Sequence, residues 1–223
     1  MVQDATTHPV DRPSASYSRG EYRADAIVHL LGVTAGWVGG FCLAVPDVTS
    51  AATPVSVMAL AVYAMAMTAM LISSAAYNLA GRPALKEHLR RLDHACIYLA
   101  IAGTYTPLLT RLPDMQAILT LSLVWAIAGS GAMLKLLAPR RHERLGLALY
   151  IGLGWIGLPL IPALSGLLLP DTGIWIGLGA IIYTAGIGAY LAERVRYHNV
   201  VWHLMVLAAA ACHYKAIWVE FRA

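Results

Sequence analysis

The run VSVMALAVYAMAMTAMLISSAAYNLA, residues 55–80, continues over its whole length without one charged side chain. A helix needs about 20 apolar residues to cross the roughly 30 Å hydrocarbon core of a bilayer. The bilayer core offers no water to the backbone, so the N–H and C=O groups must be satisfied within the segment itself. This stretch therefore predicts a transmembrane α-helix.

On both sides of this run, six further stretches have the length and polarity of a membrane span. They cover residues 26–45, 93–110, 115–134, 145–169, 172–192 and 200–219. The connections between them are short and contain Pro, Asp and Arg. The sequence thus predicts an all-α integral membrane protein, with a seven-helix transmembrane domain at 23–223 after a polar, flexible tail at 1–22.

Composition supports this class, since 59% of the residues are hydrophobic and only 13% are charged. Soluble domains carry about 25% charged residues, which a water-facing surface requires. The net charge of +4 does not indicate nucleic-acid binding, because the basic residues recur between apolar stretches instead of forming one patch. Membrane lipids are the expected partners, and the sequence leaves the oligomeric state open.

The basic residues predict the orientation. Thirteen of the sixteen fall in the tail or on alternate connections: Arg12, Arg19, Arg23, Arg82, Lys86, Arg90, Arg91, Lys135, Arg140, Arg141, Arg144, Arg194 and Arg196. Such residues are retained on the cytoplasmic side. We expect a multi-pass protein of the plasma (inner) membrane, with its N-terminus in the cytoplasm and its C-terminus outside.

Small residues indicate how the helices pack. Gly32, Gly36 and Gly40 recur at every fourth position of the first span, which favours close approach of a neighbouring helix. Pro159 and Pro162 predict a kink in the fifth span. The three cysteines all lie in apolar runs, which favours packing over a disulfide framework.

Polar side chains gather at the predicted cytoplasmic ends of four spans, where ionisable residues are functional candidates. They are His29, Ser74, Asn78, Asp93, His94, Asn199 and His203. The spacing of four residues places Ser74 with Asn78, and Asn199 with His203, on shared helix faces. Structural explanations stay open, because Asp93 could pair with Arg90 or Arg91. His213, deeper in the last span, is typical of a hydrogen-bonded packing residue.

The run LRRLDHACIYLAIAGTYTP (89–107) resembles a signature of the bacterial haemolysin III family. That family lies within the progestin and adipoQ receptor superfamily, which in turn resembles alkaline ceramidases. The segment SSAAYNLA (73–80) stands where the family carries S-x-x-x-H, and WHLMVLAAAACHYKAI (202–217) resembles its seventh-helix motif. His29 corresponds to the histidine of the family's first helix.

The resemblance implies a zinc site on the cytoplasmic side, held by one histidine at the end of the second helix and two on the seventh. Asp93 and Ser74 correspond to residues that contact or position the water on the metal. Zinc chemistry of this kind permits hydrolysis of a lipid-derived amide.

The sequence departs from this pattern at the ligands. Asn78 and Asn199 occupy two of the three ligand positions, and His203 alone matches. An amide oxygen is a weak zinc donor, so we expect a site impaired for metal. A rearranged site could use His203 and Asp93 with one of His29, His94 or His198; the alternative is a metal-free cluster in which the two asparagines satisfy each other and Asp93.

Three functions follow as hypotheses. The first is a metal-dependent hydrolase or receptor for a lipid-like amide, with Asp93 and Ser74 at the reaction centre. The second is a pore, which the family name suggests, although the outer half offers little polarity beyond Thr104, Tyr105 and Thr106. The third is a metal-free bundle that binds a lipid or a partner. Zinc is the cofactor implied, and no other is expected.

Overall fold

The computed structural model describes residues 18–44, 53–112, 115–138, 143–160 and 166–222, and this part of the chain contains seven α-helices and no strand. The elements are α1 (Arg19–Ala44), α2 (Pro54–Leu79), α3 (Pro83–Leu109), α4 (Met115–Leu137), α5 (Glu143–Trp155), the 3₁₀ turn η1 (Leu158–Leu160), α7 (Pro170–Leu191) and α8 (His198–Arg222). The seven helices correspond to the seven predicted spans.

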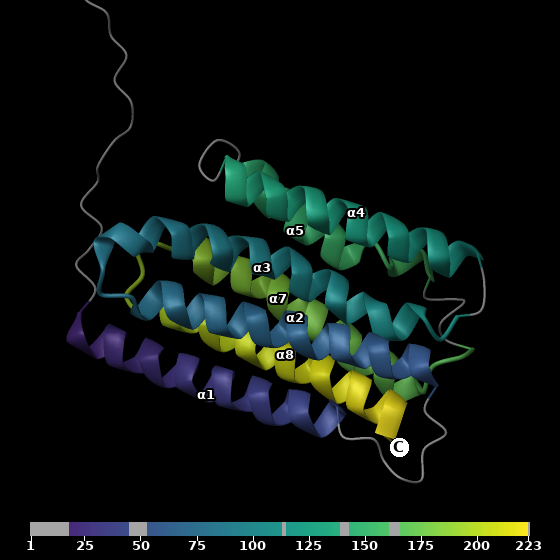
Figure 1. The fold of residues 1–223 in the computed structure, drawn as a ribbon. Helices are drawn as coiled ribbons and strands as arrows, with labels where there is room; N and C mark the ends of the chain where they lie inside the picture. Colours follow the sequence, from purple (N-terminus) through teal and green to yellow (C-terminus); the bar gives the residue numbers. More distant parts are fainter. Residues whose placement is uncertain (1–17, 45–52, 113–114, 139–142, 161–165, 223) are drawn as a thin grey trace, which may run out of the picture.

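The helices run side by side in one elongated bundle, and each reverses the direction of the one before it (Figure 1). The N-terminal end of α1 and the C-terminal end of α8 therefore lie at opposite ends of the bundle. The main helix pairings are α7 with α8, α2 with α3, α3 with α4, and α1 with both α2 and α8. This arrangement confirms the all-α membrane bundle.

Five of these helices are long and apolar enough to cross a membrane by length and composition: α1, α2, α4, α7 and α8. Helix α3 has 27 residues, but its first turns carry charged residues that lower its hydropathy. Helix α5 is apolar and has 13 residues. The hydropathy signal is thus strongest at the five long apolar helices and weaker at α3 and α5.

The helix starts follow from local capping. Ser18 and Glu21 form a capping box, in which Oγ of Ser18 accepts from the Glu21 N–H at 3.2 Å and Oε2 of Glu21 accepts from the Ser18 N–H at 2.9 Å. Thr53 caps α2 by accepting from the Ser56 N–H, and Pro54 fills the first helical position. Helices α3 and α7 also begin at a proline. All three cysteines are free, as the sequence predicts.

The glycines of α1 bring it close to α2, which confirms the predicted small-residue face. A Cβ atom at Gly36 would lie 2.7 Å from Cδ1 of Leu71, closer than real side-chain contacts allow. The hydroxyl of Thr68 on α2 also donates to the Gly36 carbonyl oxygen at 3.4 Å. Close backbone approach of this kind is what glycine permits in membrane helices.

Three spans differ from their predicted bounds. Helix α1 begins at Arg19, seven residues before the predicted start at 26 and inside the predicted tail. Helix α3 begins at Pro83, so Asp93 lies inside the helix and not at its first turn. Helix α5 ends at Trp155, well before residue 169, and Pro159 lies in the 3₁₀ turn that follows. Pro159 therefore follows the end of helix α5 and does not kink the helix. Pro162 lies outside the described residues.

A tyrosine from α3 explains where α5 ends. The Tyr105 hydroxyl donates to the Gly154 carbonyl oxygen at 2.9 Å and accepts from the Gly157 N–H at 3.1 Å. It thus satisfies backbone groups that a continuing helix would pair internally. Pro159 has no N–H to extend the ladder.

At the opposite end of the bundle, Glu220 near the end of α8 contacts residues of two neighbouring helices. Its carboxylate accepts from the Leu169 N–H and the Thr172 hydroxyl at the start of α7. It also pairs with Arg111, which follows α3, at 2.9 Å. The buried charge of Glu220 is therefore satisfied, and it links three helices at the end away from the N-terminus.

Candidate functional site

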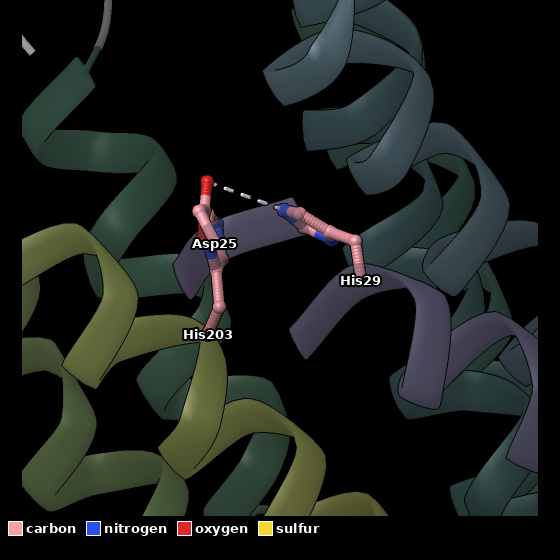
Figure 2. Close-up of side chains that lie close together, drawn as sticks. All are labelled: Asp25, His29 and His203. Atoms are coloured by element: carbon pink, nitrogen blue, oxygen red, sulfur yellow. Dashed lines mark hydrogen bonds and ion pairs between the residues drawn. The ribbon is translucent and has the colours of Figure 1, made fainter. Parts of the chain in front are cut away.

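Three buried side chains from the first and last helices converge near the N-terminal end of the bundle (Figure 2). Asp25 and His29 lie one turn apart on α1, and His203 comes from α8. Oδ1 of Asp25 is 2.6 Å from Nδ1 of His203, and Oδ2 is 3.6 Å from Nε2 of His29. The two imidazole centroids are 4.4 Å apart. The three residues are between 1% and 7% exposed.

These three side chains could hold a metal ion, because their ligand atoms all lie within 4.8 Å of one another. Two donors bound to one zinc at about 2.0–2.1 Å are at most about 4.2 Å apart. Small side-chain rotations would therefore close the group around one ion. Nε2 of His29 is buried and forms no hydrogen bond among the described residues, although it lies 3.6 Å from Oδ2 of Asp25, so its lone pair is available to a metal ion.

The hydrogen bonds of His203 define its tautomer. A carboxylate only accepts, so Nδ1 of His203 carries the proton that it donates to Asp25. Nε2 then has a lone pair, and it faces Nδ2 of Asn78 at 3.5 Å. An imidazole whose one nitrogen is bonded to a carboxylate is oriented through that bond, with the other nitrogen left for a ligand.

The two asparagines occupy the space beside His203. Nδ2 of Asn199 donates to Oδ1 of Asn78 at 3.5 Å, and Nδ2 of Asn78 donates to the Ser74 carbonyl oxygen at 3.0 Å. The sequence prediction that they satisfy each other is confirmed. The same prediction included Asp93, but no hydrogen bond joins Asp93 to either asparagine among the described residues.

Asp93 faces the hydroxyl of Ser74 across the interface of α2 and α3, and both line one cavity with His29 and His203. The ion pairs of Arg90 and Arg91, the two arginines that the sequence offered to Asp93, are with another carboxylate. Both arginines bond Glu87, at 3.1 and 3.4 Å, on a more exposed part of α3.

The cavity measures about 70 Å³, and its lining residues come from α1, α2, α3, α7 and α8. Four polar residues, His29, Ser74, Asp93 and His203, occupy part of its wall. The rest is formed by Tyr183 of α7 and by apolar side chains: Val28, Gly32, Met70, Leu71, Ile97, Trp202, Val206 and Leu207. The lining, mostly apolar with a few convergent polar groups, has the composition of a small-molecule site, while the volume is well below the roughly 300–1,000 Å³ of such sites.

Two of the proposed substitute ligands stay outside the group that could hold a metal. The carbonyl oxygen of His94 accepts from the Tyr150 hydroxyl of α5. His198 begins α8, and its Nδ1 is buried without a partner among the described residues. Neither belongs to the Asp25, His29 and His203 group, whereas His29, the third proposed substitute, does.

Asp25 is the residue that the sequence analysis missed. It lies between the predicted tail, which ends at residue 22, and the predicted span, which begins at residue 26. The signal was present, because Asp25 and His29 are four residues apart and share a helix face. Glu21, one turn earlier, fixes this end of α1 by accepting from the Tyr197 N–H before α8 at 2.9 Å.

Comparison with known proteins adds independent information. The sequence profile of the family described as "Haemolysin-III related" matches residues 21–214. The chain is 30% identical over 192 residues to "Hemolysin-3" of Bacillus cereus, covering 84% of this chain and 86% of that protein. It is 29% identical to "Hemolysin-3 homolog" of Bacillus subtilis (strain 168), over 72% of this chain and 76% of that protein.

A more distant similarity extends to animals. The chain is 25% identical to the human "Monocyte to macrophage differentiation factor", over 70% of this chain and 68% of that protein. The matched region includes the helices that supply the candidate site, because the profile begins at residue 21 and continues past His203.

Proposed function

Because this chain belongs to the haemolysin III family, within the progestin and adipoQ receptor superfamily, we propose that its buried site binds zinc and hydrolyses a lipid-derived amide. The observation that carries the proposal is the convergence of Asp25, His29 and His203 beside a mostly apolar cavity. Ionisable groups in a membrane bundle are costly and mark functional sites.

The three positions that the family resemblance implies as ligands do not fit zinc in this chain. Asn78 presents its amide nitrogen to His203, and its oxygen accepts from Asn199. Neutral amides are weak zinc donors, so this set offers one good ligand. The proposed reaction uses neither Asn78 nor Asn199.

The Asp25, His29 and His203 group does fit, because two imidazoles and a carboxylate are an established zinc donor set. The orphaned Nε2 of His29 and the buried Asp25 carboxylate are the features that favour it. When bound, zinc supplies a Lewis acid that polarises a carbonyl and acidifies water.

The remaining polar residues of the cavity have roles that their positions support. The Ser74 hydroxyl and the Asp93 carboxyl group face each other in the wall, where they can bind the attacking water and the amide. Asp93 can accept a proton from that water and return it to the leaving nitrogen, which is general acid–base catalysis. Both are proposed as catalytic residues.

A plasma-membrane location is part of the proposal, and the positive residues support a cytoplasmic N-terminus. The candidate site then lies beneath the inner surface of the membrane, at the end of the bundle where α1 and α8 begin. A lipid substrate would reach it from the inner leaflet.

Zinc content of the purified protein tests the proposal. We expect about one zinc per chain, and at least a tenfold lower affinity in His29→Ala and in His203→Ala. His88→Ala is the matched control, because His88 is exposed on α3. A wild-type chain without zinc would instead be the metal-free bundle that Asn78 and Asn199 predict.

The reaction is tested in proteoliposomes that contain an N-acylsphingosine with a fluorescent acyl chain. Release of free fatty acid should depend on zinc and fall at least a hundredfold in Asp93→Asn. If the protein bound zinc but released no fatty acid, the hydrolase proposal would be overturned and a metal-dependent receptor would remain. Dye leakage from the same vesicles would favour a pore.

A further inference from the structure

The short link between α7 and α8, residues 192–197, lies at the same end of the bundle as the start of α1 (Figure 1). The candidate site lies just inside this end, and its three side chains are only 1–7% exposed. The link ends six residues before His203. Anything that reaches the site from the predicted cytoplasmic side must therefore pass the link and the first turns of α1 and α8.

The link ends in a strained backbone conformation. Tyr197 has a φ of 63°, and in the part of the chain that the structure describes no other residue except glycine has a positive φ. In this region the Cβ atom crowds the following carbonyl oxygen, so a bulky residue adopts it rarely. Strain of this kind persists only where neighbouring contacts impose it, and it gathers at switch regions.

Three contacts hold Tyr197 in place. Its N–H donates to Oε1 of Glu21 on α1 at 2.9 Å. Its phenol lies against the first turn of α1, where a Cβ atom at Gly20 would be 2.9 Å from the hydroxyl oxygen. The guanidinium of Arg196 lies 5.2 Å from the centroid of its ring. The link is thus fastened to α1 across the gap between the first and the last helix.

The bond between Glu21 and Tyr197 is the strongest of the contacts that close this end outside the site itself. Its acceptor is a carboxylate, and bonds to ionised groups are stronger than neutral ones. The Tyr22 hydroxyl donates to the Leu79 carbonyl oxygen at 3.4 Å, and Asn199 donates to Asn78 at 3.5 Å, so both bonds are long. Glu21 therefore controls whether the link stays against α1.

We propose that the link at 192–197 is a gate over the cytoplasmic side of the buried site. Glu21 holds the gate shut, and the strain at Tyr197 favours its opening. Because Glu21 lies one turn before Asp25, release of the link uncovers the helix ends that carry Asp25 and His203. The inference concerns the site of the proposed function, but its main test does not require zinc.

A cysteine beside His203 reports the opening. With Cys42, Cys96 and Cys212 replaced by alanine, Asn78→Cys places a thiol next to Nε2 of His203. The measurement is the rate at which a charged methanethiosulfonate labels this thiol in protein held in lipid nanodiscs. Adding Glu21→Gln should raise the rate about tenfold, because a neutral amide is the weaker acceptor for the Tyr197 N–H.

Ser18→Ala is the matched control for Glu21→Gln. Ser18 forms the other half of the capping box at the start of α1, and it does not contact the link. Its loss weakens the same helix end but leaves the Glu21 bond to Tyr197 intact. The labelling rate should equal that of the parent. Equal acceleration by both substitutions would mean that fraying of α1 exposes the thiol, and the gate would be refuted.

The role of the strain is tested by a pair of variants at one position. Tyr197→Ala and Tyr197→Gly both remove the phenol, but only alanine keeps the cost of a positive φ in the closed gate. We expect labelling about fivefold faster with alanine than with glycine. Equal rates in the two variants would overturn the claim that strain favours opening.

Zinc exchange separates this inference from the proposed function. In chains that retain Asn78, Glu21→Gln should speed both uptake of zinc and its release to a chelator about tenfold, with an unchanged equilibrium affinity. A chain that binds no zinc would refute the proposed function, while thiol labelling would still decide on the gate. A chain that binds zinc, but whose labelling and exchange rates ignore Glu21→Gln, would keep the function and refute the gate.

Discussion

Asp25 forms the shortest contact of the candidate site, and it stands at a position that composition assigns to neither tail nor span. The other polar residues, His29, Ser74, Asn78, Asp93 and His203, were predicted to lie at a common depth. The structure places them around one site. Sequence spacing can predict the helix face and the membrane depth of a residue. The contact between Asp25 and His203, however, depends on how α1 packs against α8.

Asp25→Asn tests the role of that carboxylate. The amide keeps the shape but loses the charge and the strong acceptor for Nδ1 of His203. We expect zinc affinity to fall about 10- to 100-fold, measured by competition with a chelator. Asp171→Asn removes an exposed carboxylate from the start of α7 and should leave affinity unchanged.

Restoring the histidines that the family carries at positions 78 and 199 tests whether zinc binding can be rescued. Asn78→His with Asn199→His, introduced into the Asp25→Asn chain, would restore a three-histidine set with His203. We expect zinc binding to return to about one ion per chain. Failure of this triple variant to regain zinc, while it still folds, would argue that α1 and not the family position determines the metal site.

Among the elements, α2, α4, α7 and α8 could be predicted closely from hydropathy alone. The start of α1 was placed seven residues late, because its first turns are charged. The start of α3 was misplaced because its first turns are charged, and those turns extend the helix beyond its apolar part. The end of α5 was misplaced because it depends on Tyr105 from another helix. Local sequence does not contain that contact.

Close packing of α1 on α2 predicts the effect of a larger side chain. Gly36→Leu should force the helices apart, because even a Cβ atom there meets Leu71. Overpacking costs about 1–3 kcal/mol, so we expect the thermal midpoint in detergent to drop by several degrees. Gly129→Leu on α4, where nothing lies within 4 Å, is the control. Equal midpoints would refute the packing role.

For the whole molecule, the alternating helices predict which connections share a side of the membrane. With Cys42, Cys96 and Cys212 replaced by alanine, Arg82→Cys and Arg196→Cys should react with an impermeant maleimide from the cytoplasmic side only. Arg111→Cys should react from the opposite side. Labelling of Arg82→Cys and Arg196→Cys from different sides would refute the topology and the shared depth of the site.

The division of the site between α1 and α8 has a consequence for biosynthesis. Asp25 and His29 emerge from the ribosome long before His203, by roughly ten to thirty seconds at ordinary elongation rates. During that interval the first helix carries a carboxylate and an imidazole with no partner from the last. A chain stopped before α8 can never assemble the centre, so only finished molecules acquire it.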